Sequence, residues 1–241
     1  MNELRGTGVA LVTPFNTDGS VDFVSLEKLV NHCINGGLEY LVALGTTGES
    51  ATLNKSEKKQ VVDCIIKTAN GRVPVVIGIG GNNTADVIET IKSTDFTGIT
   101  AILSVSPYYN KHTQEGIYQH YKAIAEVAPK PIILYNVQGR TSSNILPATT
   151  LRLANDFKNI VAVKEASGNM EQIMDIIQHK PEGFLVISGD DALTLPIVAA
   201  GGDGVISVVA NAFPKQFSDM VRLTLKGDVA SARPLHYSLT E

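Results

Sequence analysis

The chain has 241 residues, of which 44% are hydrophobic, and its formal net charge at pH 7 is −4. This length and composition suit one large globular domain, and the mildly acidic balance argues against nucleic acid or an anionic membrane as a partner. The first residues show no apolar signal segment, no apolar run reaches transmembrane length, and both cysteines fall in helical patterns. We therefore expect a protein of the cytoplasm.

Short apolar runs, typical of buried strands, alternate with helical patterns along the chain. The expected strands are Gly8–Thr13, Tyr40–Leu44, Pro74–Ile79, Ile99–Val105, Pro131–Asn136, Ile160–Val163, Phe184–Ser188 and Gly204–Val209. The expected helices are Asp22–Asn35, Asn54–Ala69, Thr84–Ser93, Gln114–Val127, one that begins near Pro147, Met170–Gln178, Ala192–Ala199 and Pro214–Lys226. Strict alternation favours parallel strands with right-handed crossovers, and eight units favour closure of the sheet. The sequence therefore predicts an α/β fold, a (β/α)8 barrel over residues 1–227.

An open, doubly wound sheet is the structural rival to this barrel. Such a fold often carries a dinucleotide-binding fingerprint after its first strand, and none follows here. In a barrel, the active site lies at the carboxyl ends of the strands, so the sequence predicts the functional residues at those ends.

Polar residues concentrate at those strand ends. Thr46 and Thr47 follow the second strand, Tyr135 lies near the end of the fifth, and Lys164 comes directly after the sixth. Burial disfavours an ammonium group, and the neutral amine that results attacks a ketone. A tyrosine hydroxyl relays protons, and threonines in a glycine-flanked turn suit a carboxylate. The pattern therefore predicts Schiff-base chemistry.

Each of these residues also has a plainer interpretation. Lys164 by itself fits a lysine that extends from a strand end to the surface. Gly45 to Gly48 by itself fits an ordinary turn between strand and helix, and Tyr135 fits a strand-end aromatic residue with its hydroxyl in water.

Other binding motifs are weak. The stretch Gly78 to Gly81 lacks the lysine and hydroxyl of a phosphate-binding loop. Barrels often bind phosphate after strands seven and eight, where Asp190 and Asp191 disfavour a phosphorylated substrate. The five histidines show no metal-ligand spacing, so we expect no metal.

Five motifs together resemble the dihydrodipicolinate synthase family, within the pyruvate-dependent class I aldolases that include the N-acetylneuraminate lyases. The resemblance covers essentially the whole chain, and its motifs are Gly45 to Ser50, Ser106 to Asn110, Tyr135 to Thr141, Val163 to Ala166 and Ser188 to Asp191. It implies condensation of pyruvate with L-aspartate 4-semialdehyde to 4-hydroxy-tetrahydrodipicolinate, in lysine and diaminopimelate biosynthesis. It also implies no cofactor beyond the covalent lysine–pyruvate adduct, and a homo-oligomer, either a dimer or a tetramer.

The resemblance implies a role for each site residue. Lys164 would form the Schiff base with pyruvate, Tyr135 would shuttle protons, and Thr46 would join its hydrogen-bond relay. Tyr109 would complete that relay from a neighbouring subunit across a tight dimer interface. The substrate-binding residues would be Thr47 for the pyruvate carboxylate, Arg140 for the carboxylate of the semialdehyde, and Gly189 and Ile206 as lining.

The sequence departs from the family pattern at two positions where proline is usual, and at its C-terminal end. Gln138 and His112 stand where proline is usual, which puts the rigidity of both loops in question. Family members continue into a C-terminal helical region, of which residues 228–241 resemble only the beginning. We therefore expect either a truncated chain or a naturally reduced variant.

Three functions stay open from the sequence. The first is the synthase reaction, and the second is a related pyruvate-dependent aldolase or lyase that acts on a sugar acid. The third is a catalytically silent barrel that serves as a subunit or binding module, against which Lys164 and Tyr135 argue.

Some members of the family are inhibited by L-lysine, which binds at the tight dimer interface. The resemblance implies that the residues of this regulatory pocket are Ser50, Lys55, Lys58, Asn82, Asp86 and Tyr108. Because Lys55 and Lys58 stand where inhibited bacterial members carry histidines, we expect two fixed cations to repel the cationic ligand.

Overall fold

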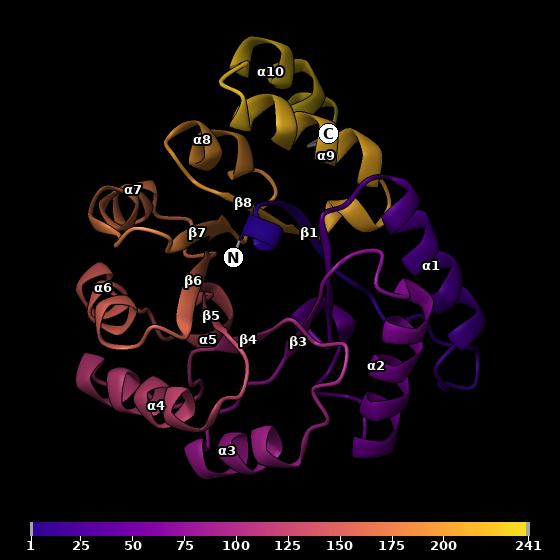
Figure 1. The fold of residues 1–241 in the computed structure, drawn as a ribbon, viewed down its shortest axis with the longest axis horizontal. Coiled ribbons are helices and arrows are strands. Elements are labelled where there is room, and N and C mark those ends of the chain that lie inside the picture. Colours follow the sequence, from indigo (N-terminus) through magenta and orange to yellow (C-terminus); the bar gives the residue numbers. More distant parts are fainter. Residues whose placement is uncertain (1, 240–241) are drawn as a thin grey trace.

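The computed structural model describes residues 2–239 and shows eight parallel strands closed into a barrel, with the helices arranged around it (Figure 1). Each strand pairs with the next along the chain, and the first pairs with the last. The strands are β1 (Gly6–Ala10), β2 (Tyr40–Ala43), β3 (Val75–Gly78), β4 (Ala101–Val105), β5 (Ile132–Asn136), β6 (Ile160–Glu165), β7 (Leu185–Ser188) and β8 (Gly204–Ser207). The predicted (β/α)8 barrel is confirmed.

The helices follow the strands in the predicted order. They are α1 (Phe23–Asn35), α2 (Lys55–Ala69), α3 (Thr84–Ser93), α4 (Gln114–Val127), α5 (Gln138–Thr141), α6 (Pro147–Asp156), α7 (Met170–His179), α8 (Thr194–Ala199), α9 (Pro214–Leu225) and α10 (Val229–Ser238). Three short 3-10 helices complete the described part of the chain: η1 (Asn2–Leu4), η2 (Thr46–Gly48) and η3 (Val209–Asn211).

Local signals in the sequence explain where the helices begin. The predicted capping box at α2 is present: Glu57 donates its backbone N–H to the Asn54 side chain at 3.0 Å, and the Glu57 carboxylate accepts the Asn54 N–H at 2.8 Å. Asp22 caps α1 through its side chain alone, which accepts the Ser25 backbone N–H, and Pro147 occupies the first turn of α6 as expected.

Two differences from the predicted elements concern the site. The sixth strand continues through Glu165, so Lys164 lies within β6 rather than after it. The strand is longer than predicted because β6 continues to pair with β5 and β7 at Lys164 and Glu165. Both residues are charged, so the pattern of apolar residues does not indicate this pairing. The short helix α5 was not predicted, because four polar or small residues have no helical periodicity of their own.

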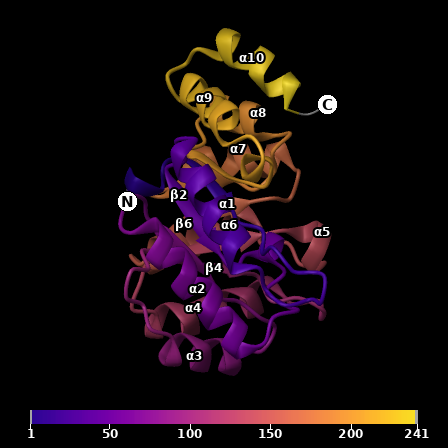
Figure 2. The same cartoon turned by 90° about the vertical axis from the view of Figure 1, so that its right-hand side faces the viewer.

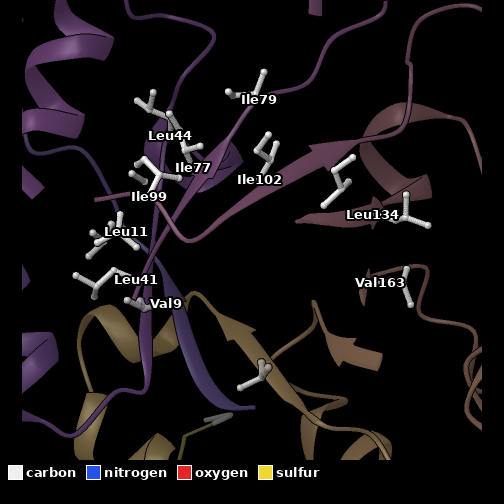
Figure 3. Close-up of a cluster of buried hydrophobic side chains, with 14 of the residues drawn as sticks. Val9, Leu11, Leu41, Leu44, Ile77, Ile79, Ile99, Ile102, Leu134 and Val163 are labelled. Carbon is white, nitrogen blue, oxygen red and sulfur yellow. The ribbon is translucent and has the colours of Figure 1, made fainter. Parts of the chain in front are cut away.

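Alternation along each strand divides the apolar side chains between two layers. One set fills the barrel interior and includes Tyr40, Ile133 and Ile206. The other packs between the sheet and the helices and includes Leu41, Ile102 and Leu134, which Figure 3 shows together with their neighbours. Because both faces of every strand are buried, the strands consist of nearly continuous apolar residues.

The two ends of the barrel differ in what they carry. Leu4 of η1 is fully buried and belongs to the interior cluster, so it closes the end where the strands begin. Figure 2 shows α5 at the opposite side, beyond the carboxyl ends of the strands. Helix α10 folds back against α9 and α8 on the outside. The predicted division between residues 1–227 and 228–241 stays a prediction, and residues 1, 240 and 241 lie outside the described part.

Candidate active site

Lys164 and Tyr135 are direct partners across neighbouring strands. The register of β5 and β6 pairs Tyr135 with Lys164. Tyr135 belongs to the interior cluster, and Lys164 points the same way because it stands two residues after Ala162 of that cluster. The Nζ atom of Lys164 lies 4.5 Å from the centroid of the Tyr135 ring. An amine and a phenol are thus held side by side at the carboxyl end of the barrel, where the sequence predicts them.

The buried position of Lys164 makes its amine unusually acidic. Only 4% of the residue is exposed, and burial lowers its pKa to about 8. The Asp191 carboxylate opposes this shift, while the positive charge of Arg140 adds to it. The Lys164 amine is therefore neutral in roughly a tenth of the molecules at pH 7, whereas at the ordinary lysine pKa the neutral fraction is negligible. The interpretation of Lys164 as a lysine that reaches the surface is wrong.

Tyr135 remains a proton donor in this setting. The residue is 7% exposed, and burial raises the pKa of its hydroxyl. A hydrogen bond with the Thr46 side chain and the charge of Arg140 both act in the opposite direction. The alternative that this hydroxyl simply lies in water is also wrong. A protonated phenol with a hydroxyl partner is suited to passing protons to and from a bound substrate.

The turn that carries Thr46 and Thr47 is held in a strained backbone conformation. Leu44 immediately before it has φ 55°, which is uncommon for a residue with a side chain. Gly78 of β3 makes room for this course, because a Cβ there would lie only 2.3 Å from the Leu44 carbonyl oxygen. The η2 turn then brings Thr46, which is exposed, and Thr47, which is half-buried, to the open end of the barrel.

Arg140 reaches the site from α5. Its charge acts on both Tyr135 and Lys164, which places the guanidinium near the pair. The residue is exposed, and a guanidinium can bind a carboxylate through two parallel hydrogen bonds. Gln138, where the family usually has proline, is the first residue of α5, a position at which proline costs no helical hydrogen bond.

Gly189 gives Lys164 its space. A Cβ at this glycine would lie 2.7 Å from Ala166 Cβ and 3.0 Å from Lys164 Cε, so a side chain there would displace the lysine. Ile206, by contrast, is 1% exposed and belongs to the interior cluster. Gly189, directly after β7, thus adjoins the predicted nucleophile, whereas Ile206 lies on β8, two strands away from β6.

Tyr109 is not brought into the site within one chain. It is 88% exposed, has φ 78°, and forms no hydrogen bond within residues 2–239. A positive φ is unfavourable for an aromatic residue, and such strain is typical of functional loops. The predicted regulatory residues also lie near the surface: Ser50 and Lys58 are partly exposed, and Lys55, Asn82, Asp86 and Tyr108 are exposed.

Comparison with known proteins agrees with this geometry. Residues 3–241 match the model of the dihydrodipicolinate synthetase family. The chain belongs to this family. A curated relative from Flavobacterium psychrophilum, a 4-hydroxy-tetrahydrodipicolinate synthase, is 60% identical over 99% of this chain and 82% of its own.

Solved structures of family members have the same fold. Dihydrodipicolinate synthase from Thermotoga maritima is 42% identical with a TM-score of 0.95, over 98% of this chain and 81% of its own. A dihydrodipicolinate synthase described as the first monomeric variant is 41% identical, also with a TM-score of 0.95, over 98% and 80%.

Three polar residues around the site belong to the sequence motifs, but no role at the site was predicted for them. Asp191 accepts the backbone N–H groups of Val208 and Val209 at 3.0 and 2.9 Å and acts on the charge of Lys164. Asn136 and Glu165, directly after Tyr135 and Lys164, are fully buried and hydrogen-bonded to each other. The sequence did contain a signal for Asn136 and Glu165: strand alternation assigns both polar residues to a buried face, where a polar side chain needs a hydrogen-bond partner.

Among residues 2–239, no cluster of three or more acidic, histidine or cysteine side chains has the geometry to hold a metal ion. None of the helices in this part of the chain is long and apolar enough to cross a bilayer.

Proposed function

We propose that Lys164 is the nucleophile in the condensation of pyruvate with L-aspartate 4-semialdehyde to 4-hydroxy-tetrahydrodipicolinate, a step of lysine and diaminopimelate biosynthesis. The chain is an enzyme of the lyase class with a class I aldolase mechanism. The observation that carries this proposal is the pairing of a buried lysine, whose pKa is lowered to about 8, with the Tyr135 phenol at 4.5 Å from Nζ to ring centroid.

The first half of the reaction activates pyruvate. The neutral amine of Lys164 attacks the keto carbon, and the resulting carbinolamine loses its hydroxyl as water, with Tyr135 as the proton donor. Loss of a proton from the methyl carbon converts the imine to an enamine. Thr47 and the N–H groups of its turn hold the pyruvate carboxylate, for which donors near a glycine-flanked turn are suited.

The second half joins the two substrates. The enamine carbon attacks the aldehyde carbon of the semialdehyde, and the aldehyde oxygen takes up a proton through the relay of Tyr135 and Thr46. The amino group of the semialdehyde then attacks the imine carbon, which closes the ring and releases the Lys164 amine. Arg140 orients this substrate by binding its carboxylate, for which a guanidinium provides two parallel donors.

Tyr109 supports a homo-oligomer, either a dimer or a tetramer. An exposed tyrosine in a strained conformation on the loop after β4 suits a side chain that completes the relay of a second copy of the chain. Sedimentation of the active protein, with turnover of the Tyr109→Phe variant, tests this assignment. We further propose that the reaction needs no cofactor beyond the lysine adduct and takes place in the cytoplasm.

A substrate panel tests the reaction against the remaining alternatives. Turnover of pyruvate with L-aspartate 4-semialdehyde supports the synthase. Cleavage of a sugar acid to pyruvate without this condensation would assign the site to a related lyase, and neither activity would leave the barrel as a silent subunit. Arg140 favours the synthase, because it presents a carboxylate-binding group at the open end of the barrel.

L-Lysine is expected to inhibit this enzyme weakly, with little effect at millimolar concentration. Lys55, the first residue of α2, is exposed, and Lys58 is half-buried one turn later. Two cations near the proposed regulatory pocket repel a cationic ligand by about 1–4 kcal/mol per close pair. Titration of L-lysine at fixed pyruvate concentration measures the effect, and the Lys55→His/Lys58→His variant should be inhibited more strongly. Each kcal/mol of repulsion weakens binding of L-lysine by about fivefold, so strong inhibition of the unaltered enzyme below 1 mM would contradict the repulsion.

A further inference from the structure

A second pair of residues lies back to back with the pair at the site. The register that joins Tyr135 to Lys164 also joins Asn136 to Glu165, one position further along each strand. Because successive side chains of a strand point to opposite faces, this second pair points out of the barrel, into the layer beneath the helices. Both residues are fully buried.

Glu165 is a buried carboxylate surrounded by neutral donors. The Asn136 side-chain amide lies 3.1 Å from both of its oxygens. The Gln172 side-chain amide donates at 3.0 Å and the Ser167 backbone N–H at 2.8 Å. No lysine, arginine or histidine within residues 2–239 forms an ion pair with it. A charge buried in this manner depends on its hydrogen bonds, so each donor is held firmly in place.

Asn136 closes the segment that carries Arg140. Its Oδ1 accepts the backbone N–H of Ile145 at 3.0 Å, and its Nδ2 lies 2.8 Å from Asn144 Oδ1. Helix α5, with Arg140, lies between these two ends. The Thr141 hydroxyl fixes the interior of the segment, with contacts of 3.0 and 2.9 Å to the carbonyl oxygens of Val137 and Ser143.

The Gln172 side chain of α7 joins the two halves of this network. It donates to Glu165 and exchanges hydrogen bonds with the Asn144 side chain at 2.9 and 3.2 Å. The strand of Lys164 and the segment of Arg140 are thus tied together through the face of the sheet that no substrate reaches. The Asn136 side chain contacts Glu165 on one side and residues 144 and 145 on the other. A shift of Glu165 would therefore be passed through Asn136 to the segment that carries α5.

We propose that Glu165 is a positioning residue that sets Arg140 relative to Lys164 through Asn136, and so governs binding of the second substrate. The proposal rests on the function proposed above, in which Arg140 binds the carboxylate of the semialdehyde. It predicts that damage to the network weakens use of the second substrate while the first half of the reaction, on Lys164, continues.

The Glu165→Gln variant tests this directly. The new amide replaces one acceptor with a donor that faces the Asn136 amide and either the Gln172 amide or the Ser167 N–H, so hydrogen bonds to that oxygen become repulsive contacts. We expect the KM for L-aspartate 4-semialdehyde to rise about tenfold or more, because small misplacements of a binding group cost factors of this size. The KM for pyruvate and the borohydride-trapped pyruvate adduct should change less than about threefold.

An exchange variant separates the proposed role from a loss of stability. Glu165→Gln/Gln172→Glu places the carboxylate on α7, where the new amide at position 165 donates to it. This variant should recover part of the lost affinity for the second substrate, because position 172 still accepts from the Asn144 amide but no longer donates to Asn144 Oδ1. Hydrogen exchange of residues 137–146 should increase in the single variant and return toward the parent in the double. If Glu165→Gln does not fold, Asn144→Ala removes the loop side of the network alone and should show the same division between the two substrates.

Glu39→Gln is the matched control at the other end of the barrel. The Glu39 carboxylate accepts the Thr7 N–H at 2.7 Å and pairs with Arg222, so its loss affects stability without touching α5. We expect both KM values to stay at those of the parent enzyme. Equal changes of both KM values in a folded Glu165→Gln enzyme, or unchanged exchange of residues 137–146, would overturn the positioning role. Absence of a pyruvate adduct in the parent would instead overturn the proposed function on which this role rests.

Discussion

Lys164→Met is expected to abolish the condensation, with a loss of at least about 10⁴-fold in turnover, because no other amine replaces a covalent nucleophile. Lys164 is buried beside Tyr135, and the absence of a Cβ at Gly189 leaves the space that the Lys164 Cε occupies. Methionine has a similar length and fills the same space without an amine. Steady-state turnover of pyruvate with L-aspartate 4-semialdehyde measures the loss.

Covalent trapping identifies the nucleophile independently of turnover. Borohydride reduction in the presence of pyruvate should leave an adduct that peptide mapping places on Lys164, and Lys164→Met should form none. Lys158→Met, at an exposed lysine two residues before the same strand, is the matched control and should keep both the adduct and the activity. An adduct on another lysine of an active enzyme would disprove the assignment.

Lys164→Met is also expected to stabilise the fold at neutral pH. The Lys164 pKa falls from 10.5 to about 8 on folding, so the unfolded chain binds more protons between these values and stability rises with pH there. Below pH 8 the full cost of the buried lysine is present, on the order of 3 kcal/mol. Urea unfolding should show Lys164→Met more stable than the parent at pH 7, with the difference shrinking toward pH 10.5. Adduct formation should accelerate from pH 7 to 8 for the same reason.

Tyr135→Phe is expected to slow turnover by about 10²–10⁴-fold, the span typical of lost acid–base assistance. The ring would keep its place beside Lys164, but the hydroxyl that hydrogen-bonds with Thr46 would be gone. Dehydration of the carbinolamine and protonation of the aldehyde oxygen both lose their donor. Formation of the trapped adduct should therefore slow as well as overall turnover.

Tyr118→Phe provides the control for removal of a tyrosine hydroxyl. Tyr118 is also 7% exposed, and its hydroxyl donates to Asp156 at 2.7 Å in the layer between helices, away from Lys164. This variant should lose some stability and keep its turnover. Near-full activity of Tyr135→Phe would remove the phenol from the relay and leave proton transfer to Thr46 or to bound water.

The order of the elements could be predicted because their signals are local. Strands buried on both faces are nearly continuous apolar runs, and the Asn54–Glu57 box and Pro147 mark helix starts without reference to the rest of the chain. Lys164 and Tyr135 could be placed at one end of the barrel because parallel strands end on the same side. The family motifs then attached a reaction to these positions.

The extension of β6 through Glu165, the helix α5 and the pairing of Asn136 with Glu165 were decided only by the tertiary structure. Each depends on contacts between segments distant in sequence: the register of β5 against β6, and the bonds that tie residues 144 and 145 and Gln172 to the site strands. The low pKa of Lys164 has the same origin. Sequence alone determined that a lysine stands beside a buried strand, whereas its amine becomes reactive only because the closed barrel removes water from around it.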